Sequence, residues 1–155
     1  MKALALLMSA AALILAVMLH MGDRHEAPAT GQPMEVAVHM GRLQRYHQKW
    51  WAAGRAGNAE LAAFYLHEME EAMEEIAEAD VVDEGVEVSK HMRTYGLPMV
   101  AELERLLKEQ GVAEMTAQGD MLVNACNSCH AITGHPYLRI QVPESVHFPD
   151  QIFTP

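Results

Sequence analysis

Hydrophobic side chains recur every three or four residues along most of this chain, which is the period of an α-helix with one buried face. In residues 34–54 the series consists of Val36, Met40, Leu43, His47, Trp50 and Gly54. The opposite side of the same segment carries Arg42, Arg45 and Lys49. The pattern predicts an amphipathic helix whose inner stripe contains one histidine.

Two more segments have the same period with few interruptions. Residues 59–79 place Ala62, Leu66, Met69, Met73 and Ile76 on one side and glutamates on the other. Asn58 precedes them and is a suitable N-terminal cap. Residues 113–132 place Met115, Met121 or Leu122, Ala125 and Cys129 on their inner side. Both segments are predicted to be helices.

The segment of residues 85–110 is periodic but interrupted. Its inner positions are Val88, Met92, Tyr95, Met99, Leu103 and Leu106. Gly96 and Pro98 fall inside the pattern, and an interior proline removes one backbone hydrogen bond at a cost of about 3 kcal/mol. We expect a kink or a break near residues 94–97.

Four amphipathic helices joined by short links favour an all-α fold, an antiparallel four-helix bundle over residues 34–132. No alternating strand pattern competes with this interpretation. Residues 133–155 contain four prolines, which exclude a helix. They also contain enough large apolar side chains to pack on the bundle, so we expect an extended C-terminal tail.

The N-terminal residues 1–33 form a separate region. Lys2 is followed by an uncharged run over residues 3–19 and then by a polar stretch with proline and glycine. This is the pattern of a cleaved signal peptide or of a retained membrane anchor through residues 3–19. Either one would export the rest of the chain, so we expect a periplasmic domain, soluble or anchored to the inner membrane.

The chain of 155 residues has a formal net charge of −10. Eleven Asp and Glu residues, and no Lys or Arg, lie between Arg55 and Lys90. This charge argues against nucleic acid and anionic membrane surfaces as partners. A partner protein with a basic docking face fits better, although a solvated helix face explains the same pattern.

Both cysteines of the chain lie in the stretch CNSCH, as Cys126 and Cys129, and His130 follows directly. The spacing C-x-x-C-H is the attachment motif of c-type haem. Thiols three residues apart share one face of a helix and can each bond a vinyl group, and the next residue then reaches the iron from one side. We therefore expect one covalent haem c with His130 as the proximal ligand.

Other uses of these residues are weaker. A structural disulfide across so short a loop would restrict the unfolded chain very little, and a redox C-x-x-C lacks its strand-helix context. Zinc ligands at Cys126, Cys129, His130 and His135 would strain tetrahedral geometry because two are adjacent. The stretch from His67 to Glu75 lacks the facing Glu-x-x-His sets of a di-iron site.

The residue on the other side of the iron would decide the chemistry. In an antiparallel bundle the end of the fourth helix lies beside the first half of the first helix. His47 is therefore the leading distal candidate and Met40 the alternative, while Leu43 over the iron would leave an open site for small gases. His135 or His147 could also reach from the tail. Trp50 follows the same stripe and could stack near the porphyrin edge.

On these residues the chain resembles the class II, cytochrome c′-like four-helix cytochromes, in which C-x-x-C-H lies in the last helix. Segments around His47, around CNSCH and at the ending PDQIFTP are also similar to a group of small exported bacterial proteins with no assigned function. That likeness aligns their helix-one histidine with His47. Homodimers through the first two helices are an analogy from such bundles, and the long tail departs from the cytochrome c′ pattern.

The sequence thus favours a mono-haem periplasmic electron carrier that performs no catalysis, acting with a redox partner protein. A gas-binding protein for NO or CO with an open distal site is the alternative. A third hypothesis is an interaction or metal-storage module without haem, which uses the methionine-rich, acidic helices and in which Cys126 and Cys129 form a disulfide.

Overall fold

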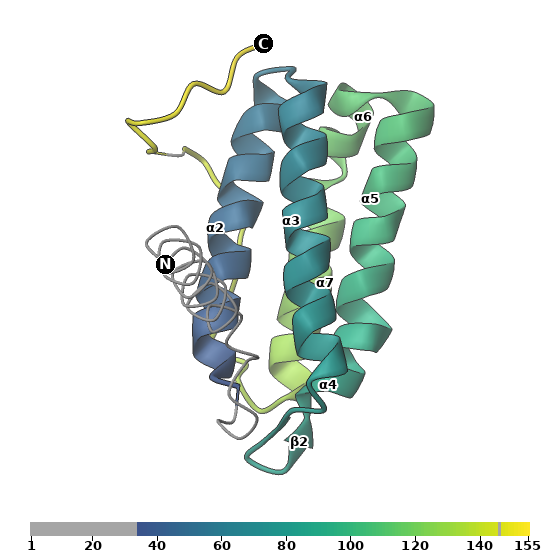
Figure 1. The fold of residues 1–155 in the computed structure, drawn as a ribbon, viewed down its shortest axis with the longest axis vertical. Helices are drawn as coiled ribbons and strands as arrows, with labels where there is room; N and C mark the ends of the chain where they lie inside the picture. Colours follow the sequence, from purple (N-terminus) through teal and green to yellow (C-terminus); the bar gives the residue numbers. More distant parts are fainter. Residues whose placement is uncertain (1–33, 146) are drawn as a thin grey trace, which may run out of the picture. The chain divides into compact units, whose positions relative to one another are not determined.

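The computed structural model describes residues 34–145 and 147–155 (Figure 1). The predicted signal peptide or membrane anchor lies outside these described residues. The helices are α2 (Val36–Arg55), α3 (Ala59–Glu78), α4 (Val88–His91), the π-helix η1 (Met92–Gly96), α5 (Leu97–Gln110), α6 (Val112–Ala117) and α7 (Gly119–Ile132). Two short strands are β1 (Val82–Asp83) and β2 (Val86–Glu87). The prediction of an all-α fold is confirmed.

The long helices α2, α3, α5 and α7 lie side by side with their axes roughly aligned (Figure 1). α2 packs on α3 over its whole length, α3 packs on α5, and α7 packs against η1 and α5. The turn between α2 and α3 is short because Asn58 caps α3, its side chain accepting a hydrogen bond of 3.0 Å from the Leu61 N–H.

The predicted interruption of the third segment is a π-helix. The chain continues from α4 through η1 into α5 without leaving a helical path, and Pro98 lies in the first turn of α5. Proline has no N–H to donate to the preceding turn, and the Leu97 N–H before it donates to the Met92 carbonyl five residues back, which is the π-helical pattern. A π-turn inserted in a helix is frequently found at functional sites.

The hairpin of β1 and β2 was not predicted, so the expectation of no strands was wrong at this point. Val82 pairs with Glu87 and Asp83 with Val86 in antiparallel register. Glu84 and Gly85 both have positive φ, of 48° and 86°, which is the backbone of a type I′ turn. Strands of two residues are too short to show alternation, and Glu84 is an unusual residue for this conformation.

The fourth predicted helix is two helices, because the chain bends at Gln118 between α6 and α7. The bend brings Gly119 against the indole of Trp51, where a Cβ would lie only 2.6 Å from a ring carbon.

The core lies between all the described helices, from α2 to α7. Its largest fully buried side chains are Trp50, Leu66, Met69, Ile76, Leu103, Met115, Leu122 and Val100. The Trp50 indole N–H donates to the Met115 sulfur at 3.4 Å. The predicted inner stripe of α2 is buried from Leu43 onward.

The extended tail contacts α2 and α3. The Lys49 ammonium lies 5.0 Å from the centre of the Phe148 ring, and the Tyr65 hydroxyl hydrogen-bonds the Gln151 side-chain oxygen at 2.9 Å. Cation–π contacts at exposed sites contribute about 0.5–1 kcal/mol. Among the described residues, no helix is long and apolar enough to cross a membrane.

Gly54 in α2 allows α6 to approach closely. A Cβ at this position would overlap the Thr116 side chain, whose hydroxyl is held by the Val112 carbonyl at 2.6 Å. We expect Gly54→Ala to lower the free energy of unfolding by about 1–3 kcal/mol, as overpacking does. In the haem-free chain, Gly41→Ala, in the same helix with no atom within 4 Å of the new Cβ, should instead raise it by about 0.5–1 kcal/mol. Chemical denaturation measures both changes, and equal effects would contradict this account.

Candidate functional site

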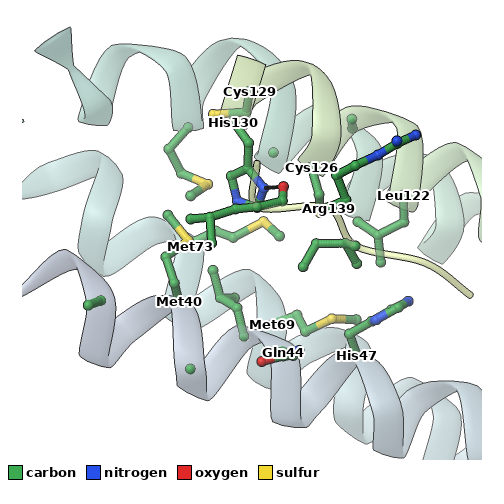
Figure 2. Close-up of a pocket in the computed structure, with 18 of the residues that line it drawn as sticks. Met40, Gln44, His47, Met69, Met73, Leu122, Cys126, Cys129, His130 and Arg139 are labelled. Atoms are coloured by element: carbon green, nitrogen blue, oxygen red, sulfur yellow. Dashed lines mark hydrogen bonds between the residues drawn. The ribbon is translucent and has the colours of Figure 1, made fainter. Parts of the chain in front are cut away.

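A cavity of about 540 Å³ lies between α2 and α7, with α3 and η1 at its back and residues of the tail along one side (Figure 2). Its lining is mostly apolar and includes four methionines, Met40, Met69, Met73 and Met92. Cofactor sites are commonly apolar cavities of roughly 300–1,000 Å³ with a few placed polar groups. Polar side chains reach the cavity from α2, from α7 and, through Tyr137 and Arg139, from the tail.

One wall, α7, contributes Cys126, Cys129 and His130. Both cysteines are free thiols. Burial raises the pKa of Cys126 to about 11 and also raises that of Cys129. Both sulfurs are therefore protonated at neutral pH, and the thiols share one helical turn on the side of α7 that faces the cavity.

The ring of His130 points into the cavity (Figure 2). Its Nδ1 lies 2.8 Å from the backbone carbonyl oxygen of Leu138. A carbonyl can only accept, so Nδ1 carries a proton, and in the neutral ring the lone pair is then on Nε2. This is the arrangement found in metal-ligating histidines, which donate the other ring N–H to a carbonyl or carboxylate.

Residues 137–140, which we call the strap, follow α7 and line the cavity. The strap is attached to α7 by Asn127, within the CNSCH motif. The Asn127 side-chain N–H donates to the Ile140 carbonyl at 2.9 Å, and the Ile140 N–H donates to the Asn127 side-chain oxygen at 2.8 Å. The side-chain amide of Asn127 thus pairs with both the N–H and the C=O of Ile140, as the backbone of a neighbouring strand would.

On the other wall, α2 contributes His47, whose ring is stacked on Trp50 with centroids 6.0 Å apart. His47 is 7% exposed, and its buried Nε2 has no hydrogen-bond partner in the described part of the chain. Burial lowers the pKa of His47 to about 4, so the ring is neutral at pH 7. A buried nitrogen with no partner is costly, and a ligand in the cavity would provide one.

Of the other residues predicted to contact the haem, some line the cavity and others do not. Met40 and Leu43 line the cavity, whereas Trp50 contacts it only through His47. His135 and His147 are not among the lining residues. In Figure 2, Met40 lies toward the His130 end of the cavity and His47 toward the Leu122 end.

The neutral state of buried His47 predicts an acid-dependent loss of stability. The pKa of His47 is about 4 in the folded chain and about 6.5 when unfolded. As pH falls, His47 is therefore protonated in the unfolded chain before it is protonated in the folded chain. The free energy of unfolding decreases between about pH 6.5 and pH 4.

Over this pH range we expect the free energy of unfolding of the haem-free wild-type chain to fall by about 3 kcal/mol more than that of His47→Phe. Denaturation at a series of pH values measures the difference. Parallel pH profiles for the two chains would contradict it.

The residues present fit a haem. The cavity offers two thiols one turn apart, a histidine beside them whose Nδ1 is held by the Leu138 carbonyl, and on the facing wall a neutral imidazole with one nitrogen unpartnered among the described residues. Within the described ranges, no group of three or more His, Cys, Asp or Glu is placed to hold a bare metal ion. The zinc alternative with His135 gains no support from this geometry.

The apolar residues between Pro136 and Pro143 predicted a tail that packs along the bundle and could cover the haem edge. Sequence reasoning identified neither the hydrogen bonds of the strap nor the role of Asn127. Nothing in the spacing C-x-x-C-H assigns a role to its variable positions.

No protein-family model, curated protein or solved structure matches this chain.

Proposed function

We propose that this chain is an exported mono-haem c-type cytochrome that transfers electrons and catalyses no reaction. The observation that carries the proposal is the cavity whose one wall presents Cys126, Cys129 and His130 together. Within this proposal, residues 34–132 form an antiparallel four-helix bundle opened between its first and last helices to admit the macrocycle.

Each residue has a separate task. The Cys126 and Cys129 sulfurs would bond the vinyl groups of the haem, and His130 would bind the iron through Nε2. His47 would supply the second axial nitrogen, since it is neutral at pH 7 and lacks another partner. The haem, when bound, supplies an iron that cycles between ferrous and ferric states. The methionines of α3 and η1 would exclude water and adapt their shape to the ring.

The partner would be a redox protein with a basic docking surface. α3 contains seven glutamates and no Lys or Arg, so its outer face would attract such a surface and raise the association rate at low salt. The uncharged run over residues 3–19 supports export to the periplasm, where haem attachment to c-type cytochromes takes place.

An absorption spectrum of the chain produced with a haem-maturation system tests the proposal. Sharp ferrous α and β bands that do not change under CO are expected from six-coordinate iron. A chain that carries covalent haem but binds CO rapidly would instead have an open distal site, and a chain without haem would refute both.

Gas binding is the second candidate, favoured by one observation. His47 lies toward the Leu122 end of the cavity in Figure 2, away from His130. If the macrocycle kept this geometry, Met40 and Leu43 would face the iron, and the neutral His47 ring could donate a hydrogen bond to a bound gas. The CO response described above separates the two functions.

A further inference from the structure

We propose that Asn127 is a positioning residue that sets the reduction potential of the iron through the strap. This inference rests on the proposed haem function. Asn127 does not line the cavity; it would act through Ile140, Leu138 and then His130.

The path consists of three hydrogen bonds. Two join the Asn127 amide to the N–H and the C=O of Ile140, at 2.8 and 2.9 Å. The third joins the Leu138 carbonyl to Nδ1 of His130 at 2.8 Å. Leu138 is two residues from Ile140, so fixing Ile140 fixes the position of the carbonyl that His130 uses.

The side chains of the strap contribute little to its attachment. Tyr137 is 73% exposed and Leu138 is 47% exposed, so their side chains are only lightly packed. On the N-terminal side, the Leu138 N–H donates to the His135 carbonyl at 3.0 Å, and the His135 N–H donates to the His130 carbonyl at 2.7 Å. On the C-terminal side, the paired bonds of Asn127 hold Ile140 to α7, and these are the bonds that the proposal concerns.

The direction of the effect follows from the chemistry of imidazole. A carbonyl that accepts from Nδ1–H makes Nε2 a stronger donor to a metal. A stronger donor stabilises ferric iron relative to ferrous iron and lowers the reduction potential. Loss of the Asn127 attachment lets the Leu138 carbonyl move away, and the potential should rise.

A purely covering role for the strap predicts the opposite sign. A detached strap would admit water to the haem edge, and water stabilises the more charged ferric state. The potential would then fall. The sign of the shift therefore distinguishes a positioning role from a covering role.

The experiment compares Asn127→Ala with Ser128→Ala, which changes the neighbouring exposed residue of the same motif. Both chains are produced with haem maturation and titrated potentiometrically. The exchange of the His130 Nδ1 proton with solvent is followed by NMR in the reduced protein, or in its CO complex if that is the diamagnetic form. We expect Asn127→Ala to raise the potential and to accelerate this exchange at least tenfold, with Ser128→Ala matching the wild type.

An unchanged or lowered potential in Asn127→Ala overturns the inference while leaving the haem function intact. A wild-type chain without covalent haem overturns the proposed function, and the inference with it. If Asn127→Ala does not mature, Asn127→Asp keeps the acceptor for the Ile140 N–H and loses the donor to its carbonyl. Its potential should exceed that of the charge-matched Asn124→Asp, at an exposed position of the same helix; equal potentials overturn the inference.

Discussion

A Cys126→Ser/Cys129→Ser chain is expected to emerge from haem maturation without covalently bound haem and with a lower melting temperature than the wild type. Both thiols lie on the cavity-facing side of one turn of α7, so a haem joined to them fills the space between α2 and α7. The cavity of about 540 Å³ is much larger than the volume removed by a single Leu→Ala change, which costs about 3–5 kcal/mol. The haem-free variant should be less stable than the holoprotein by at least about 3 kcal/mol.

Haem staining after denaturing electrophoresis and thermal unfolding measure the two effects. Ser128→Ala is the matched control, since it alters the motif without removing a thiol, and it should retain both haem and stability. A double-serine chain with an unchanged melting profile would show that the cavity is not filled by an attached group.

A His47→Ala chain is expected to retain covalent haem but to change from low-spin to high-spin iron. Truncation removes the imidazole that α2 contributes to the cavity lining, and its Nε2 has no partner among residues 34–145 and 147–155. With a single axial ligand left, the reduced iron should bind CO. Absorption spectra of the oxidised, reduced and CO-treated forms measure the change.

Met40→Leu is the control for this second effect, because Met40 lines the same wall and leucine keeps most of its volume. It should leave the wild-type spectrum unaltered. If Met40→Leu instead changes the iron from low spin to high spin and His47→Ala does not, Met40 is the distal ligand. Met40 lies toward the His130 end of the cavity in Figure 2, which would agree with that result.

The helices could be predicted because each buries one face, and burial leaves a period in the sequence. The stripe from Leu43 to Gly54 is buried as the period indicates, and the interruption near Gly96 is present as η1. The bend at Gln118 does not interrupt the hydrophobic period. It depends on the closeness of Trp51 to Gly119, a contact between residues far apart in the chain, and the apolar positions on either side of the bend still fit one helical pattern.

The candidate site was predictable only where chemistry fixes residue spacing. Cys126, Cys129 and His130 must be close in sequence to serve one haem, so their order is informative. The strap is different, because Asn127 binds backbone atoms of Ile140 and His130 binds a backbone atom of Leu138. Any residue can provide a backbone partner, and only the three-dimensional path of the chain after α7 brings these atoms together.

The central claim is that one haem is bonded to Cys126 and Cys129. Intact-mass measurement of the wild-type chain after haem maturation, combined with its pyridine haemochrome spectrum, tests this most directly. The account predicts a mass increase of one haem that survives denaturation and a haemochrome band typical of two thioether bonds. An unmodified mass, with haem absent or removable by acid extraction, would contradict it.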